Sequence, residues 1–141
     1  MIESAEEFKR LRESENPYEY RRAAHEEAPL DVWRDVIDRF PEMRFWVAQN
    51  KTAPIQILRI LAQDSDSRVR SMVAEKRKID REVKEILIKD PDSGVRGRLV
   101  WNAKLEREYL EVLSNDREQF VRDVALDKLN KISQQGSGGN A

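Results

Sequence analysis

A 26-residue repeat runs through most of this chain and limits the folds that are open to it. The repeat is marked by an apolar residue followed by arginine, at Met43-Arg44, Val69-Arg70, Val95-Arg96 and Val121-Arg122. Other apolar residues keep the same register, as in the column Val47, Val73, Leu99 and Ala125. A unit of this length is too short to bury its own apolar side chains. Consecutive units must therefore stack and bury them between neighbours.

Each unit contains two short helical patterns and no alternation typical of a strand. The first pattern (helix A) carries the apolar–Arg pair, with Val69, Met72 and Val73 at helical spacing; the second (helix B) has Ile57, Ile60 and Leu61. The five prolines fall at expected helix starts, where a missing N–H is tolerated. The sequence predicts an all-α fold, a right-handed α-solenoid of about five helix pairs over residues 16–133. Residues 1–15 are expected to form a capping helix, and residues 134–141 a flexible Gly/Ser tail.

Composition excludes several kinds of site. The 141 residues include no cysteine and one histidine, which rules out disulfides, iron–sulfur clusters, cysteine zinc sites, thiol catalysis and His-rich metal sites. The single His25 has no nucleophile specified nearby, so we expect no enzymatic activity, no metal and no cofactor. Neither a targeting signal nor an apolar stretch of roughly 18 residues is present, which predicts a cytoplasmic protein without a membrane partner.

A periodic set of charges is predicted to tie the units together. The arginines Arg44, Arg70, Arg96 and Arg122 share the repeat period with the aspartates Asp64, Asp90 and Asp116. Such an arginine column can bind phosphates. It can also join one helix A to an acidic side chain at the corner of the neighbouring unit, and this structural role is the one we expect. We name this set the Arg–Asp ladder.

Two aromatic residues break their columns and are candidates for binding a partner. Phe45 aligns with polar or small residues, among them Ser71 and Gly97, and Trp101 aligns with Gln49, Glu75 and Asp127. Large aromatics at otherwise polar positions are typical anchors of protein interfaces. Trp33, in contrast, lies in a mostly apolar column and is predicted to be part of the core.

Charged surfaces offer two further candidates. The outward positions of the B helices are acidic in the later repeats, at Glu82, Glu85, Glu108 and Glu111. If the B helices line the concave side, this face repels nucleic acid and attracts a basic protein. The corner Lys76 to Lys78 is locally basic and can contact an acidic partner or RNA. With 26 Lys and Arg against 27 Asp and Glu, the whole chain has no basic excess for non-specific phosphate binding.

The repeat pattern resembles a known family. Residues 43–70 read MRFWVAQNKTAPIQILRILAQDSDSRVR, with V-R-x-x-V-A-x-N, a turn, P-x-x-x-L-x-x-L-A and D-x-D-x-x-V-R as the recurring elements. This looks like the leucine-rich repeat variant family, which belongs with the HEAT-like α-solenoids, and the resemblance covers roughly residues 16–128. It implies the architecture and says little about function. Some members carry a cysteine cluster, which this chain lacks.

The expected function is a non-enzymatic, protein-binding scaffold. The segment YRRAAHEEAPLDVWRDVIDRFPEMRFWVAQNK, residues 20–51, is similar to stand-alone bacterial solenoids of the immunity-protein type. That similarity implies neutralisation of a partner toxin, and an acidic concave face would suit a basic nuclease toxin. The alternative is a nucleic-acid-binding module, by analogy with HEAT-like DNA glycosylases. The near-zero net charge, the short chain and the acidic B helices argue against it.

Overall fold

A computed structural model describes residues 1–139 of the chain and confirms the all-α prediction for this part. It contains ten α-helices and one short 3₁₀ helix, with no strand among the residues described. Residues 140–141, the end of the predicted tail, lie outside the described residues. None of the helices within residues 1–139 has both the length and the apolar composition that crossing a membrane requires.

The helices alternate between the two predicted kinds. The N-terminal helix is α1 (Ala5–Glu13). The A helices are α2 (Pro17–His25), α4 (Arg44–Gln49, entered through the 3₁₀ helix η1, Pro41–Met43), α6 (Ser67–Ala74), α8 (Ser93–Trp101) and α10 (Gln119–Gly139). The B helices are α3 (Leu30–Arg39), α5 (Ile55–Leu61), α7 (Arg81–Leu87) and α9 (Arg107–Leu113). The described residues of the predicted Gly/Ser tail, 134–139, all belong to α10.

Local sequence explains where these short helices begin. Asp66 and Asp92 precede α6 and α8, and each side chain accepts a hydrogen bond from a backbone N–H of the first turn, at 2.9 and 2.7 Å. Asp80 caps α7 in the same way, at 3.0 Å to the N–H of Val83. Pro17 is the first residue of α2, and Pro54 directly precedes α5. The turn residues therefore fix where these helices begin within each unit.

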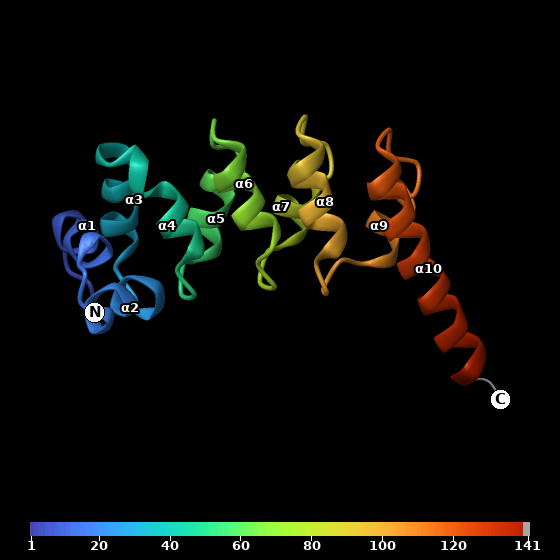
Figure 1. The fold of residues 1–141 in the computed structure, drawn as a ribbon, viewed down its shortest axis with the longest axis horizontal. Helices are drawn as coiled ribbons and strands as arrows, with labels where there is room; N and C mark the ends of the chain where they lie inside the picture. Colours follow the sequence, from blue (N-terminus) through green and yellow to red (C-terminus); the bar gives the residue numbers. More distant parts are fainter. Residues whose placement is uncertain (140–141) are drawn as a thin grey trace.

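The helices follow one another along the long axis of the molecule in chain order, from α1 at one end to α10 at the other (Figure 1). In this view α4, α6, α8 and α10 form a front layer, and α5, α7 and α9 lie behind them. Successive A helices pack directly on one another, whereas successive B helices touch much less. The A helices therefore form the more tightly packed layer.

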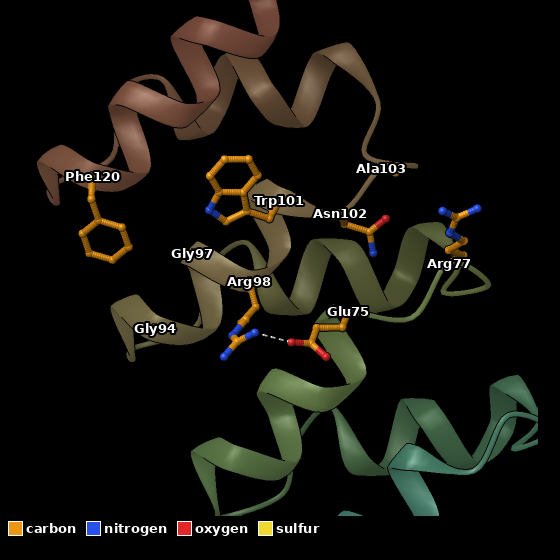
Figure 2. Close-up of a pocket in the computed structure, with 9 residues that line it drawn as sticks. All are labelled: Glu75, Arg77, Gly94, Gly97, Arg98, Trp101, Asn102, Ala103 and Phe120. Carbon is orange, nitrogen blue, oxygen red and sulfur yellow. Dashed lines mark hydrogen bonds and ion pairs between the residues drawn. The ribbon is translucent and has the colours of Figure 1, made fainter. Parts of the chain in front are cut away.

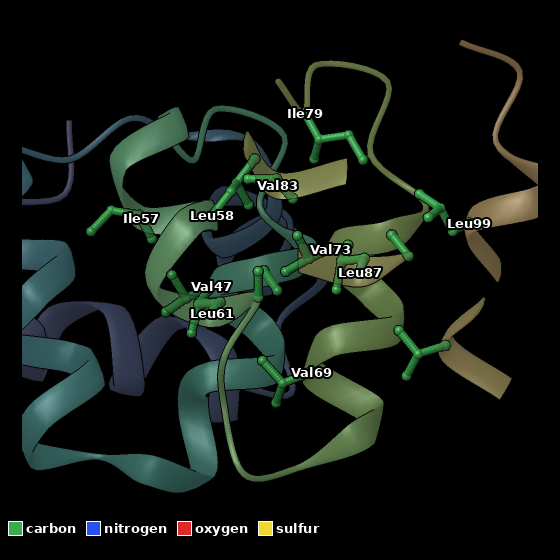
Figure 3. Packing of buried hydrophobic residues seen from close by; sticks show 14 of the residues in the cluster. Val47, Ile57, Leu58, Leu61, Val69, Val73, Ile79, Val83, Leu87 and Leu99 are labelled. Atoms are coloured by element: carbon green, nitrogen blue, oxygen red, sulfur yellow. The ribbon is translucent and has the colours of Figure 1, made fainter. Parts of the chain in front are cut away.

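One continuous core runs between the two layers (Figure 3). The columns predicted to be buried are buried: Val47, Val73, Leu99 and Ala125, and likewise Leu61, Leu87 and Leu113. One predicted apolar column is an exception. Ile60 and Val112 are exposed, because a B helix of two turns packs through a single face and these side chains lie on the other.

The N-terminal helix covers the first helix pair. Ile2, Phe8 and Leu11 are buried, and α1 packs against α2 and α3. The Phe8 ring meets Trp33 edge to face, with ring centroids 5.3 Å apart. Trp33 is buried, so the prediction that it belongs to the core is confirmed.

Candidate functional site

The arginines of the Arg–Asp ladder contact two units at once. Arg70 donates to both carboxylate oxygens of Asp90, at 2.8 and 3.2 Å, and to the backbone oxygen of Asp64 at 2.7 Å. Arg96 repeats this arrangement with Asp116 and with the backbone oxygen of Asp90. Both side chains of the Arg96–Asp116 pair are less than a tenth exposed. These groups face each other inside the stack and are not available to a partner.

The ladder is incomplete at its two ends. Arg44 reaches Asp64 at 3.3 Å, but its Nε donates to the backbone oxygen of Ile37. Arg122 donates to the backbone oxygen of Asp116 at 2.8 Å and has no carboxylate partner among the residues described. The contacts are therefore strongest in the middle of the molecule.

A second periodic column joins the A helices at their C-terminal ends, and it was missed from the sequence. Its members are Asn50, Lys76, Asn102 and Lys128, spaced by 26 residues. Asn102 donates to the backbone oxygens of Ala74 and Lys76 at 2.8 and 2.9 Å, and Asn50 donates to those of Ala23 and Glu26. Each side chain thus donates to carbonyls at or just beyond the end of the preceding A helix, where the helix itself no longer supplies donors. The signal was visible as an all-polar column of donors in the repeat register.

Lys76 belongs to this column, which changes the reading of the basic corner Lys76 to Lys78. Its ammonium donates to the backbone oxygens of Gln49 and Asn50, at 2.9 and 3.0 Å, and the side chain is half-buried. Burial, together with the nearby charge of Lys51, lowers the pKa of Lys76 to about 8. The exposed charges of this corner are therefore Arg77 and Lys78.

The acidic run on the B helices is matched by arginines. Arg81 binds both carboxylate oxygens of Glu108, at 2.6 and 2.8 Å, and contacts Glu85 at 3.4 Å. Glu82 pairs with Arg59 at 3.0 Å, and Glu111 pairs with Arg107 at 3.1 Å. The hydrogen bonds from Arg81 hold the pKa of Glu108 below its ordinary value. Each of the four glutamates has an arginine neighbour, although Arg81 is shared by Glu85 and Glu108 and Arg59 also binds Asp80, so the negative charge of this face is partly neutralised.

A hollow of about 540 Å³ lies in the A layer, between α6, α8 and the start of α10 (Figure 2). Trp101 and Phe120 line it, with exposures of 66% and 49%, together with the α8 backbone at Gly94 and Gly97. Arg77, Arg98 and Glu75 line the remaining side, where Arg98 and Glu75 form an ion pair between α8 and α6. We name this feature the Trp101–Phe120 groove.

Phe120 is the groove residue that sequence reasoning missed. Its column contains Glu42, Arg68 and Gly94, so Phe120 is an aromatic residue in a polar column. The same test that selected Phe45 and Trp101 selects Phe120 when it is applied to this column. The two glycines of the first 135 residues also meet here.

Phe45 lies elsewhere and is only partly accessible. Its ring meets that of Trp46 edge to face at 4.9 Å, and the Arg12 guanidinium lies 3.4 Å from the centroid of the Trp46 ring. Phe45 and Trp46 line a separate hollow with Pro41 and Asp66. The structure therefore does not bring Phe45 and Trp101 into one site, and Trp101 is the more exposed candidate.

The groove offers recognition chemistry: two aromatic surfaces, a backbone floor and guanidinium groups. No cluster of three or more metal-ligating His, Asp or Glu side chains occurs among residues 1–139 as described. His25 lies at the end of α2, in hollows lined by Tyr20, Arg21 and Tyr18. Comparisons with models of known protein families, with curated proteins and with solved structures give no match.

Proposed function

We propose that this chain is a non-enzymatic, protein-binding scaffold whose binding face is the A-helix layer, centred on the Trp101–Phe120 groove. The observation that carries the proposal is the exposure of Trp101 and Phe120, at 66% and 49%, on the two walls of one hollow. A large aromatic side chain gains roughly 2 kcal/mol when it is buried, so a partner that covers both of these rings would gain binding energy from each.

The repeat pattern supports a role for these two aromatics other than stacking of the units. In other units the position of Trp101 is occupied by Gln49 or Glu75. The position of Phe120 is occupied by Glu42 or Arg68. Those units stack with the same buried columns and without an aromatic at these positions. Stacking therefore does not require Trp101 or Phe120, and a binding role gives a reason for both.

The proposal includes the overall architecture, a right-handed α-solenoid of about five helix pairs of the HEAT-like kind. The chain-order stacking of helix pairs supports it. Helices on the inner side of a curved stack lie closer together than those on its outer side. The tighter packing of the A helices therefore supports the A layer as the concave surface, in place of the B helices.

A toxin-neutralising role is one form of this proposal, in which the exposed aromatics bind the toxin. The acidic B helices give it less support, because Arg59, Arg81 and Arg107 neutralise part of the negative charge that would attract a basic toxin. The A layer instead presents an apolar centre with a polar rim, which is the common anatomy of a protein interface.

Site-specific photo-crosslinking tests this proposal. A photoreactive phenylalanine analogue is placed either at Phe120, in the groove, or at Val112, which is equally exposed on the B helix α9. Each protein is irradiated in an extract of cells that naturally make the chain, and crosslinked proteins are identified by mass spectrometry. We expect a specific adduct from position 120 that Trp101→Ala removes, and none from position 112. An adduct confined to position 112, or one insensitive to Trp101→Ala, contradicts the proposal.

A further inference from the structure

We infer that the Trp101–Phe120 groove receives an acidic segment of a partner protein, with one large apolar side chain inserted between the two aromatic rings. The inference rests on the proposed function and adds the chemistry of the partner. It is built from three features of the groove: its glycine floor, its excess of positive charge and the acidic surroundings of the neighbouring hollow.

The glycine floor makes room for the Phe120 ring. A Cβ atom added to Gly97 would lie 2.8 Å from Cε2 of Phe120, so this ring lies against the α8 backbone in space that a side chain at residue 97 would need. Gly97 does not adopt a positive φ, so its backbone does not require glycine. Glycine inside a helix costs about 1 kcal/mol relative to alanine. The conformation of α8 therefore gives no reason for Gly97, whereas the close approach of the Phe120 ring, which forms one wall of the groove, does.

The charges around this space favour a carboxylate ligand. Arg98 is paired with Glu75, and the Lys128 ammonium lies 5.6 Å from the centroid of the Trp101 ring. Arg77, at the far side of the groove, has no ion pair in the part of the chain that the structure describes. Two arginines, Arg77 and Arg98, and one glutamate, Glu75, thus line the groove, so its lining carries one positive charge in excess. Guanidinium groups bind carboxylates through paired, charge-assisted hydrogen bonds, so an acidic segment fits this rim.

The neighbouring hollow on the A layer argues for a peptide over a nucleic acid. That hollow, between α4 and α6, is lined by Glu42 and Asp66 together with Arg68. A nucleic-acid strand that followed the A layer would bring its phosphates against these two carboxylates. Binding of single strands depends on a continuous positive track, which this layer lacks. A short peptide segment needs only the one groove.

Fluorescence anisotropy with three labelled peptides tests the inference on the full chain. The first peptide is Gly-Glu-Asp-Phe-Asp-Glu-Gly, the second replaces Phe by Gly, and the third keeps Phe and replaces the four acidic residues by Lys. We expect the first to bind, and the other two to bind at least about tenfold more weakly. Equal binding of the lysine peptide, or of the peptide without Phe, overturns the inference.

Variants of the chain locate the binding. Trp101→Ala and Gly97→Ala should each weaken the first peptide about tenfold, the former by removing one wall and the latter by displacing the Phe120 ring, which is the other wall. Arg77→Glu should weaken it and reduce the salt dependence of what remains. Val112→Ala, an exposed apolar truncation on α9, serves as the matched control and should change nothing. Thermal melting of each variant separates loss of binding from loss of folding.

The outcomes distinguish this inference from the proposed function. If no peptide binds but position 120 still gives a Trp101-dependent adduct, the predicted partner chemistry is wrong and the protein-binding proposal stands. If labelled single-stranded oligonucleotides of mixed sequence bind more tightly than the first peptide and lose binding in Trp101→Ala, the groove is a nucleic-acid site. That result overturns both.

Discussion

Arg96 on α8 donates to both carboxylate oxygens of Asp116, at 2.8 and 3.2 Å, although the two residues are twenty positions apart. The same guanidinium donates to the backbone oxygen of Asp90, at 2.7 Å. One side chain therefore joins the entry turns of two consecutive units. Because both members of the pair are buried, each depends on the other for compensation of its charge.

The first prediction follows from this pair. Arg96→Ala should lower the free energy of unfolding by about 3 kcal/mol, since it leaves the buried Asp116 carboxylate without its cation. Arg122→Ala is the matched control, because Arg122 holds the same repeat position but donates only to a backbone oxygen. Its effect should be less than half as large. Urea unfolding of both variants measures the difference. Equal losses would show that the ladder carboxylates add nothing to the backbone hydrogen bonds.

The second prediction concerns acid. Burial acts to raise the pKa of Asp116, but the hydrogen bonds from Arg96 and from the backbone N–H of Glu118 outweigh it, and the pKa lies below the ordinary 3.8. A carboxyl whose pKa is lowered by folding stabilises the native state above 3.8 and loses this contribution as the pH falls through the native value. The stability advantage of the parent over Asp116→Asn should therefore be full at pH 6 and shrink below about pH 4. Urea unfolding across this range tests it, and a difference that is independent of pH contradicts it.

The third prediction concerns alkali and Lys76. Its pKa falls from 10.5 to about 8 in the native state, so between these values the unfolded chain holds a proton that the native chain has released. The free energy of unfolding gains a contribution that rises with pH across this window. In Lys76→Asn, which copies Asn50 and Asn102 of the same column, this rise should be missing. The difference in the free energy of unfolding between the parent and the variant should therefore shift in favour of the parent from about pH 8 to about pH 10.

The same substitution at the exposed Lys78 controls for the loss of one positive charge. Chemical denaturation at several pH values measures both variants against the parent. A Lys76→Asn protein whose stability follows the parent in parallel throughout would mean that burial does not lower the pKa of Lys76 in the native state.

The fourth prediction separates the two layers. Reversing two charges on the B helices, with Glu82→Lys and Glu108→Lys together, should leave binding of the acidic peptide unchanged within about twofold. Both glutamates lie in the B layer with arginine partners, apart from the groove. Trp101→Ala should instead speed dissociation. Stopped-flow measurement of the association and dissociation rates decides between the layers. A large effect of the double Glu→Lys variant would place the peptide on the B helices.

Much of the fold was predictable because the repeat shows the same physical requirement several times. A buried position must be apolar in each unit, so the columns of Val47 and Leu61 identify the core without a structure. The Asp-capped starts of the A helices were visible as a recurring turn. Because the same position is apolar in several units, each unit supports the assignment of that position to the core in the others.

The site was less predictable, because a binding site departs from the repeat. Trp101 is recognisable from the sequence as an exception to its column. Phe120 is such an exception too, but it was not among the predicted binding residues. Glu108 and Glu111 looked like free charge because sequence spacing does not show that Arg81 and Arg107 turn toward them. Lys76 looked like surface charge for the same reason. Pairing of long side chains depends on rotamers, which the repeat period does not specify.

The last prediction tests whether Gly97 is kept for function. If the glycine serves only to admit the Phe120 ring as a wall of the groove, Gly97→Ala should raise the free energy of unfolding by up to about 1 kcal/mol, since alanine is the better helix former. The added Cβ meets the Phe120 ring at 2.8 Å, but that ring is half exposed and can turn toward solvent. Differential scanning calorimetry should then show an unchanged or higher melting temperature beside the loss of peptide binding. A lower melting temperature would mean that the close approach of Gly97 and Phe120 helps to hold α8 against α10, and the glycine would then have a packing role in place of a binding role.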